Sequence, residues 1–185
     1  NAEEERLLGV SLTGIMDHPV LSDTLSWGDK SLSLSLKELR QHAITTNLHW
    51  AGLLGINQST SITTVKPSGT VSQLVDSASG IHPRHHQHYI RTVRADIKDP
   101  LADFLKLQGV PWEVDMFNQN NVVFGFPIKA PENALTRHDV GAIRQLEHYL
   151  VFQQNWCEHN PSITVYVKND EWFEVGAWVY KHLDM

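Results

Sequence analysis

The hydrophobic and polar positions of the chain follow two different periods, and each change of period marks a predicted element. Residues 34–54 carry apolar side chains at close to helical spacing, and Gly55 directly after them is a candidate C-cap. Apolar or β-branched runs without this spacing indicate strands. The predicted strands are Leu7–Ile15, Ser61–Val65, Tyr89–Arg94, Asn121–Lys129 and Ser162–Val167, and the other predicted helices are Val71–Ser77, Leu101–Leu107, a long helix from Thr136 or Asp139 to Trp156, and Glu171–His182.

The alternation of strands and helices predicts an α/β fold in which at least some strands pair in parallel. The mostly apolar run Leu7–Ile15 is typical of a buried strand, and Tyr89–Arg94 is also compatible with a helix. Pro127 within Asn121–Lys129 indicates an edge strand or a bulge, because proline cannot donate to a strand ladder. No repeat or linker divides the sequence, so we expect a single partial domain over residues 1–185.

Both ends of the sequence stop abruptly, which favours a segment of a longer protein. The first predicted strand follows Glu3–Glu5 without a turn or cap, and the last predicted helix ends without a tail. Asn1 and Ala2 are set aside from the fold argument, because such residues can stem from cloning.

Composition narrows the class of protein. Of the 185 residues, 41% are hydrophobic and 19% are charged, which is typical of a chain with a buried core. The longest apolar runs, such as Val122–Phe126, are far shorter than the roughly 18–20 residues of a membrane helix. The net charge of −6 provides no basic excess for gripping long nucleic acid. We therefore expect no membrane partner and no long nucleic acid as a partner.

A single cysteine, Cys157, excludes an intrachain disulfide and an internal dithiol pair. A reducing, cytoplasmic compartment fits this usage best. Cys157 lies near the end of a predicted helix, and we expect a core or half-buried thiol there.

Candidate chemistry is concentrated in the loop after Ser61–Val65. A β-branched strand leads into Lys66 and then into a candidate helix, and the free N–H groups of a first helical turn attract anions. A glycine in such a loop lets a ligand approach the backbone closely. The lysine precedes the glycine, so this is not a Walker loop, and an ordinary capped strand-to-helix turn remains the alternative. The candidate phosphate ligands are Pro67, Ser68, Gly69, Thr70, Val71 and Ser72.

The same loop carries a resemblance to a known family. Lys66–Pro83 (KPSGTVSQLVDSASGIHP) contains the motif P-[ST]-G-[ST]-[ILV]-S, a short predicted helix and S-G-[IVW]-x-P, and His88–Arg94 (HYIRTVR) follows. Gly9–Asp17 (GVSLTGIMD) and Asn160–Val167 (NPSITVYV) supply further motifs. On these stretches the sequence resembles the adenosylcobalamin-dependent ribonucleotide reductases, most of all the monomeric ribonucleoside-triphosphate reductases.

The resemblance implies a fold and an activity for the longer protein. The fold is a ten-stranded α/β barrel, of which this chain would form part of the second half. In that family the loop at Pro67–Ser72 binds the substrate phosphates through backbone N–H groups. The implied enzyme uses adenosylcobalamin and a cysteine thiyl radical to reduce a ribonucleoside triphosphate, with a dithiol reductant such as thioredoxin.

The resemblance also implies that the catalytic residues lie outside this chain. The family needs a finger-loop cysteine with a nearby asparagine and glutamate, and further cysteines that supply electrons. Cys157 lies outside any such motif, so we assign no catalytic residue here. Contact with the cobalamin is left open, and the segment alone is expected to be inactive.

The histidines between residues 82 and 88 invite a metal hypothesis, which we do not adopt. Zinc sites draw ligands from separated pairs, and no second ligand cluster completes one here. His82 and Pro83 fall within the S-G-x-x-P element and are predicted to line the cleft beside the loop. Arg91 and Arg94 could approach phosphate, although a solvated or salt-bridged strand face is the simpler interpretation. Asp17 could face the barrel mouth, and a turn cap is the simpler role.

Alternative functions remain at this stage. A non-catalytic phosphate- or nucleotide-binding module could use the same loop. The chain could also bind nothing by itself, if the site is completed by the rest of a barrel. Exposed strand edges and apolar faces of a partial barrel predict self-association.

Overall fold

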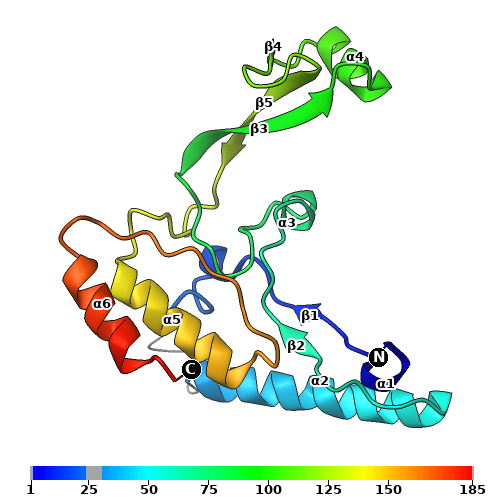
Figure 1. Ribbon diagram of the computed structural model, residues 1–185, viewed down its shortest axis with the longest axis vertical. Coiled ribbons are helices and arrows are strands. Elements are labelled where there is room, and N and C mark those ends of the chain that lie inside the picture. The colour runs from blue at the N-terminus through cyan, green and yellow to red at the C-terminus, as the bar shows by residue number, and fades with distance from the viewer. Residues whose placement is uncertain (1, 24–30, 185) are drawn as a thin grey trace. The chain divides into compact units, whose positions relative to one another are not determined.

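The computed structural model describes residues 2–23 and 31–184 (Figure 1). Asn1, one of the residues set aside above, lies outside the described residues. The chain contacts define two compact units, one formed by residues 1–84 with 133–185 and one formed by residues 85–132. The sequence predicts a single partial domain and shows no linker at these boundaries. None of the described helices is long and apolar enough to cross a membrane.

Two helices form the frame of the first unit. Helix α2 (Leu32–Leu54) packs against helix α5 (Ala142–Asn155). The Ser31 hydroxyl accepts a hydrogen bond from the Leu34 N–H at 3.3 Å, and Gly55 ends α2 with φ of 65°. The predicted helix and its C-cap are confirmed. Short α1 (Ala2–Glu5) precedes these elements and α6 (Trp172–Lys181) follows them. The core of the unit contains Ile15, Met16, Leu32, Leu36, Val65, Ile81, Val140, Phe152, Trp156 and Cys157.

The first predicted strand is much shorter and more exposed than expected. Only β1 (Val10–Ser11) pairs, in parallel, with β2 (Thr63–Thr64). Val10 is 45% exposed, so the prediction of a buried strand over Leu7–Ile15 was wrong. The reason is that a two-stranded sheet covers β1 on one side only. The chain then turns through the 3₁₀ helix η1 (Ile15–Asp17), whose apolar residues do enter the core.

Two predictions in the last third of the chain also need correction. Helix α5 begins at Ala142, because the Thr136 hydroxyl and N–H both donate to the Asp139 carboxylate and close a separate turn. Ser162–Val167 contains no strand, although it was predicted as one. Its backbone donates to side chains instead, from Thr164 to His82 and from Tyr166 to Gln145, so no strand ladder forms.

The second unit is a three-stranded antiparallel sheet with one helix. Strands β3 (His88–Asp96), β4 (Trp112–Val114) and β5 (Asn121–Lys129) lie in the order β3-β5-β4. Helix α4 (Pro100–Leu107) is capped by Asp99, whose carboxylate accepts the Leu101 N–H. The strand prediction for Tyr89–Arg94 is confirmed. A small core of Ala102, Val122 and Phe124 joins the helix to the sheet.

The register of β5 explains how a proline lies within its central strand. Asn121 accepts the Asp115 N–H at 3.0 Å, and the Gly125 N–H donates to Pro111 at 2.9 Å. Hydrogen-bonded residues alternate in an antiparallel ladder, so Pro127 faces the side of β4. Strand β4 pairs only as far as Phe124, so Pro127 needs no N–H donor. The expected edge exists locally, within a central strand.

Two glycines bring distant segments of the first unit together. Gly14 and Gly80 have φ of 69° and 54°, in the left-handed region that disfavours a side chain. A Cβ atom on Gly80 would lie 2.7 Å from the Lys66 carbonyl oxygen. The segment around Gly80 therefore runs directly against the start of the candidate loop, and only glycine fits there.

We expect Gly80→Ala to lower the free energy of unfolding by at least about 2 kcal/mol, because left-handed strain and the steric conflict with Lys66 add up. Gly52→Ala is the matched control. Gly52 lies inside α2 with nothing within 4 Å of a built Cβ, so the control should gain about 0.5–1 kcal/mol. Urea unfolding measures both. Equal stability of the two variants would contradict this account of the turn.

Candidate functional site

The candidate loop connects β2 to α3 (Val71–Leu74) in the first unit (Figure 1). The residues of β2 are buried, whereas Gly69, Thr70 and Val71 are exposed. Ser72 is fully buried beneath them. The predicted helix is present but ends at Leu74, before the predicted end at Ser77, and it has a buried serine on its inner side.

The loop contains backbone N–H groups that its own hydrogen bonds do not use. Ser72 donates both its N–H and its hydroxyl to the Ser68 carbonyl oxygen, and the Gly69 N–H donates to Pro67 at 3.0 Å. The N–H groups of Ser68, Thr70 and Val71 meet no acceptor among residues 2–23 and 31–184. A loop of this kind offers donors to an anion without breaking its own hydrogen bonds.

Gly69 is not required by the fold. Its φ lies outside the left-handed region, and a built Cβ would meet no atom within 4 Å. Glycine at this position leaves open space above the backbone, which a ligand can use to approach closely.

The hydroxyl of Thr13 lies behind the loop. It donates to the Ala78 carbonyl oxygen at 2.9 Å, accepts the Gly80 N–H at 3.0 Å, and lies 3.2 Å from the Ser68 hydroxyl. The Lys66 N–H donates to the Ser11 hydroxyl at 3.0 Å. Residues 11–13 are thus bonded to the start of the loop and to the segment after α3.

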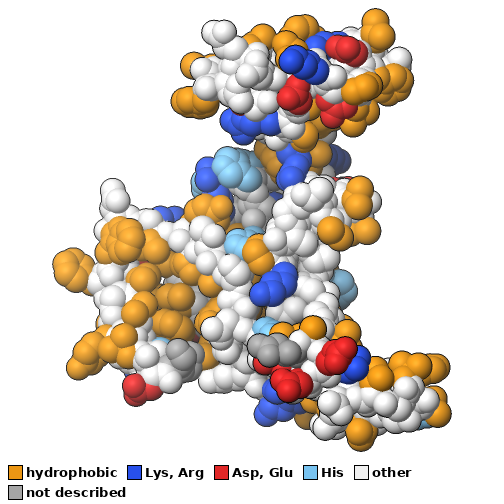
Figure 2. Space-filling model, turned by 45° about the vertical axis from the view of Figure 1, so that its right-hand side comes forward, with side chains coloured by type: hydrophobic (Ala, Val, Ile, Leu, Met, Phe, Trp, Pro, Cys, Tyr) orange, Lys and Arg blue, Asp and Glu red, His pale blue; other side chains and the backbone are white. Residues whose placement is uncertain are grey.

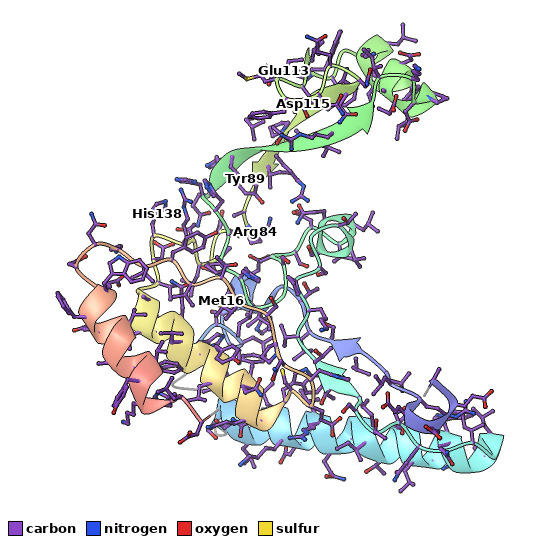
Figure 3. The ribbon with its side chains drawn as sticks, in the orientation of Figure 1. Met16, Arg84, Tyr89, Glu113, Asp115 and His138 are labelled. Carbon is purple, nitrogen blue, oxygen red and sulfur yellow. The ribbon has the colours of Figure 1, made fainter. Side chains whose placement is uncertain are left out.

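A buried ion pair fixes the far side of α3. The Arg84 guanidinium contacts both Asp17 carboxylate oxygens, at 3.0 and 2.8 Å, and donates to the Asp76 carbonyl oxygen at 2.8 Å. Asp17 also accepts the Ala78 N–H at 2.7 Å. Arg84 is 3% exposed, and Figure 3 shows it in the first unit. Sequence reasoning assigned Asp17 to a turn cap or a barrel mouth and missed Arg84, because no local pattern marks a buried arginine.

His82 and Pro83 follow Gly80 closely. The two His82 ring nitrogens lie 3.0 Å from the Ser79 carbonyl oxygen and 3.0 Å from the Thr164 N–H. The ring therefore links the segment after Gly80 to the extended Ser162–Val167. Pro83 is buried. Whether these residues line a substrate cleft stays a prediction.

The remaining histidines and arginines of the motif region belong to the second unit. Among the described residues, no cluster of three or more His, Cys, Asp or Glu side chains could hold a metal ion. Arg94 binds Asp115 at 2.6 Å, and this guanidinium, after the Phe117 N–H, lowers the pKa of Asp115. The salt-bridged interpretation of Arg94 is confirmed.

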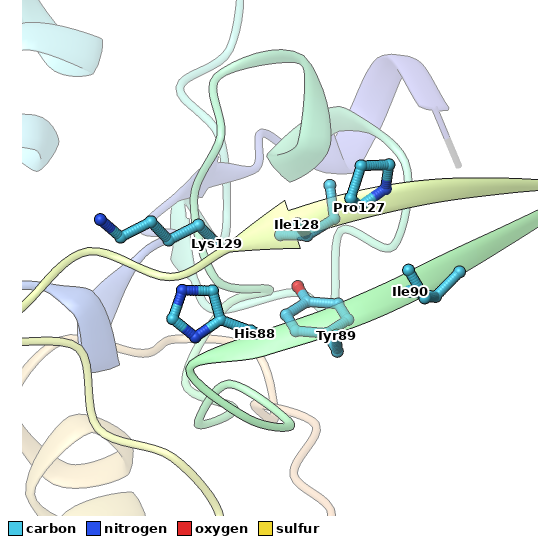
Figure 4. A pocket seen from close by; sticks show the side chains of 6 residues that line it. All are labelled: His88, Tyr89, Ile90, Pro127, Ile128 and Lys129. Atoms are coloured by element: carbon cyan, nitrogen blue, oxygen red, sulfur yellow. The ribbon is translucent and has the colours of Figure 1, made fainter. Parts of the chain in front are cut away.

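The second unit also has a hollow of about 330 Å³ beside the paired ends of β3 and β5 (Figure 4). Its walls are mainly apolar, with a histidine and a lysine added. The lining residues are His88, Tyr89, Ile90, Pro127, Ile128 and Lys129.

Two further titratable groups are buried in the first unit, Cys157 and His148. Burial raises the pKa of Cys157 to about 11, so the thiol is protonated and unreactive at neutral pH. This confirms the expected core cysteine. Burial, and then the nearby Arg144, lowers the pKa of His148 to about 4. His148 packs against Phe152, so its neutral ring behaves as a core side chain.

Comparisons with known proteins bear on this geometry. The chain is 27% identical over 97% of its length to an adenosylcobalamin-dependent ribonucleoside-triphosphate reductase of Lactobacillus acidophilus. The same kind of reductase from Levilactobacillus brevis is 30% identical over 78% of the chain. A crystal structure of a B12-dependent (class II) ribonucleotide reductase matches 96% of the chain with a TM-score of 0.77 and 25% identity. The chain is homologous to a segment of these reductases.

The homologous segment is a minor part of each reductase. The chain spans 28% of the Lactobacillus acidophilus reductase, 20% of the Levilactobacillus brevis reductase and 28% of the crystallised class II reductase. No family model matches the sequence. The match in structure extends over both compact units, so the arrangement within each unit is that of a class II reductase segment.

We expect Asp17→Asn to lower the free energy of unfolding by about 3 kcal/mol, because it removes the mostly buried carboxylate that contacts the Arg84 guanidinium. Asp76→Asn is the matched control. The Asp76 carboxylate lies 3.6 Å from the same guanidinium but is 75% exposed, so its loss should change stability little. Denaturant unfolding of both variants measures the difference. Equal losses of free energy of unfolding would show that the burial of the Arg84–Asp17 pair is not the source of its stabilising effect.

Proposed function

We propose that this chain is the part of an adenosylcobalamin-dependent ribonucleoside-triphosphate reductase that holds the substrate phosphates, through the loop Pro67–Ser72. The observation that carries the proposal is the set of N–H groups at Ser68, Thr70 and Val71, which have no acceptor among the described residues. They lie around Gly69, where the backbone is open to a ligand. The similarity to ribonucleoside-triphosphate reductases supports phosphate as that ligand.

The chemistry of the loop suits a polyphosphate chain. Backbone N–H groups bind phosphate oxygens whatever the pH, and they are held in place by the bonds of Ser72 to the Ser68 carbonyl. Exposed Lys66 at the start of the loop adds a positive charge. The segment contributes binding and orientation of the substrate, while bond breaking needs groups that it does not supply.

For the longer protein we propose reduction of the ribonucleotide to its 2′-deoxy form. Cys157 does not suit the radical step, because its thiol is buried in the core and has a raised pKa. The reactive cysteines are therefore assigned to other parts of that protein. A dithiol reductant such as thioredoxin would return them to the reduced state.

We also propose that the chain forms part of the second half of a ten-stranded α/β barrel. The parallel pairing of β1 with β2 supports this, since barrel strands of that kind run in parallel. Adenosylcobalamin would supply the radical when bound. His148 does not suit the role of a cobalt ligand, because its ring is packed beside Phe152 in the core, and we assign no residue of this chain to the cofactor.

A non-catalytic phosphate-binding module remains the second candidate. It would use the same loop and the same N–H groups. The two differ in the longer protein: an upstream N-x-C-x-E finger-loop motif would identify the reductase.

We expect ATP to shift the backbone amide NMR signals of Ser68, Thr70 and Val71 when it is titrated into the chain. Hydrogen bonds to phosphate oxygens move such signals, and adenosine without phosphates should leave them in place. Gly69→Ala should weaken ATP binding about tenfold, because the new methyl group occupies the open space above the loop.

The fold provides a control for this variant. A built Cβ on Gly69 meets nothing, so Gly69→Ala should keep the melting temperature of the unmodified chain. If the amide signals of the loop stay unchanged at millimolar ATP, the phosphate role is wrong. If only signals elsewhere move, ATP binds at another site.

We further propose that the chain by itself self-associates through the free edge of β3. The Ala130 N–H donates to Gln87, and the Ile97 N–H donates to Asn120, each at 2.8 Å, which fixes the alternation of the β3–β5 ladder. Ile90, Thr92 and their even-numbered neighbours therefore turn their backbone groups away from β5. No described strand pairs with that edge.

A second copy suits this edge. Antiparallel pairing of two β3 strands about Thr92 would place His88 opposite Asp96 of the other copy at both ends, where an imidazole N–H can donate to the carboxylate. Figure 2 shows many exposed hydrophobic side chains over the molecule, and those on β3 would add to the contact. Those on β3 include Ile90 and Val93.

We expect sedimentation equilibrium to give a mass that rises with concentration for the unmodified chain. Thr92→Pro should shift it toward the monomer, because it removes an outward N–H without touching the ladder to β5. Thr92→Val keeps the N–H and should associate like the unmodified chain. A clean monomer at high concentration would refute self-association, and an unchanged mass for Thr92→Pro would place the contact elsewhere.

A further inference from the structure

The hydroxyl groups of the candidate loop differ in whether their protons are already donated to acceptors within the protein. Ser68, Thr70 and Ser72 each carry one hydroxyl proton, and all of them resemble phosphate donors at the level of the sequence. A hydroxyl that already donates within the protein cannot donate to a phosphate oxygen at the same time. The hydrogen bonds of the structure therefore decide which of them can bind the ligand.

The hydroxyl of Thr13 donates its proton to one acceptor, the Ala78 carbonyl oxygen. A carbonyl oxygen can only accept, so the Thr13 hydroxyl donates its proton to Ala78, at 2.9 Å. A backbone N–H can only donate, so the Thr13 oxygen accepts from Gly80, at 3.0 Å. Having no second proton, Thr13 must also accept in its remaining contact, the one with Ser68 at 3.2 Å.

It follows that the Ser68 hydroxyl donates to Thr13. The Ser72 hydroxyl proton is also used within the protein, because it is donated to the Ser68 carbonyl oxygen. The Thr70 hydroxyl is exposed and makes no capping bond to α3, so its proton stays available.

We propose that Thr13 is a positioning residue for the phosphate loop, that the Ser68 hydroxyl supports the loop instead of binding phosphate, and that Thr70 is the loop's side-chain donor. This rests on the proposed phosphate role of Pro67–Ser72. Thr13 fixes the position of Ser68 relative to Ala78 and Gly80 and so sets where the neighbouring N–H groups point.

The link between Thr13 and Ser68 is tested first without a ligand, by amide hydrogen exchange at Ser72, whose N–H donates to the Ser68 carbonyl at 3.3 Å. Thr13→Val should speed this exchange about tenfold, and Thr13→Ser should restore it. Ser68→Ala should have a similar effect. The double variant Thr13→Val/Ser68→Ala should then be no faster than the faster of its single variants, because Thr13→Val already removes the hydrogen bond that Ser68→Ala removes. Additive effects would overturn the positioning role.

ATP titration then tests the assignment of donors. Thr70→Val should weaken binding about tenfold, because an uncommitted hydroxyl donor to a charged group is lost. In the Thr13→Val background, Ser68→Ala should cause no further loss of affinity. A further loss there would make Ser68 a direct ligand and overturn the proposal, and so would full affinity in Thr70→Val.

The matched control is Thr60→Val, since the Thr60 hydroxyl donates to the Glu5 carbonyl oxygen, remote from the loop. It should change neither exchange at Ser72 nor ATP affinity. If the unmodified chain shows coupled exchange but no ATP binding, the phosphate role of the loop fails, and with it the assignment of Thr70, while the hydrogen bond from Ser68 to Thr13 stands. Uncoupled exchange with intact ATP binding would instead refute the positioning role of Thr13 and leave the phosphate role of the loop standing.

Discussion

The ion pair between Arg84 and Asp17 is the interaction on which the candidate site depends. A guanidinium removed from water is tolerated only when its charge is balanced, and here Asp17 balances it while the Asp76 carbonyl oxygen accepts a further hydrogen bond. Asp17 in turn holds the Ala78 N–H. Segments from three places in the sequence therefore meet at one buried charge, and the loop that offers N–H groups to an anion is attached to this corner.

The shortness of α3 shows why such support is needed. A helix of four residues has almost no stability of its own, because nucleation costs more than so few hydrogen bonds return. Its position is therefore set by tertiary bonds, from Thr13 at one side and from Arg84 at the other. Exposed N–H groups that must meet an anion in a fixed geometry gain from this, since their arrangement exists before the ligand arrives.

Sequence reasoning found the elements whose signal is local. The periodicity of α2 and the glycine at its end were sufficient, and so was the β-branched character of β2, whereas the sequence of β3 was also compatible with a helix. Ser162–Val167 was misjudged because a strand also needs a partner, and its N–H groups find His82 and Gln145 instead. The candidate loop was recognised by its motif, but its supports were not. Whether Arg84 is buried, or where the Thr13 proton points, depends on contacts across more than sixty residues of sequence, which no local pattern encodes.

The ladder between β3 and β5 has a consequence for the chain as a whole. The Ala130 N–H donates to Gln87 at 2.8 Å, so the polypeptide leaves the first unit and comes back to it side by side. The two ends of the segment 88–129 therefore lie side by side, since His88 pairs with Lys129. Its length can grow or shrink, down to a tight turn, while the distance that Arg84 and Asn133 must span stays the same. The segment can therefore vary independently, as an insertion between two fixed anchor points.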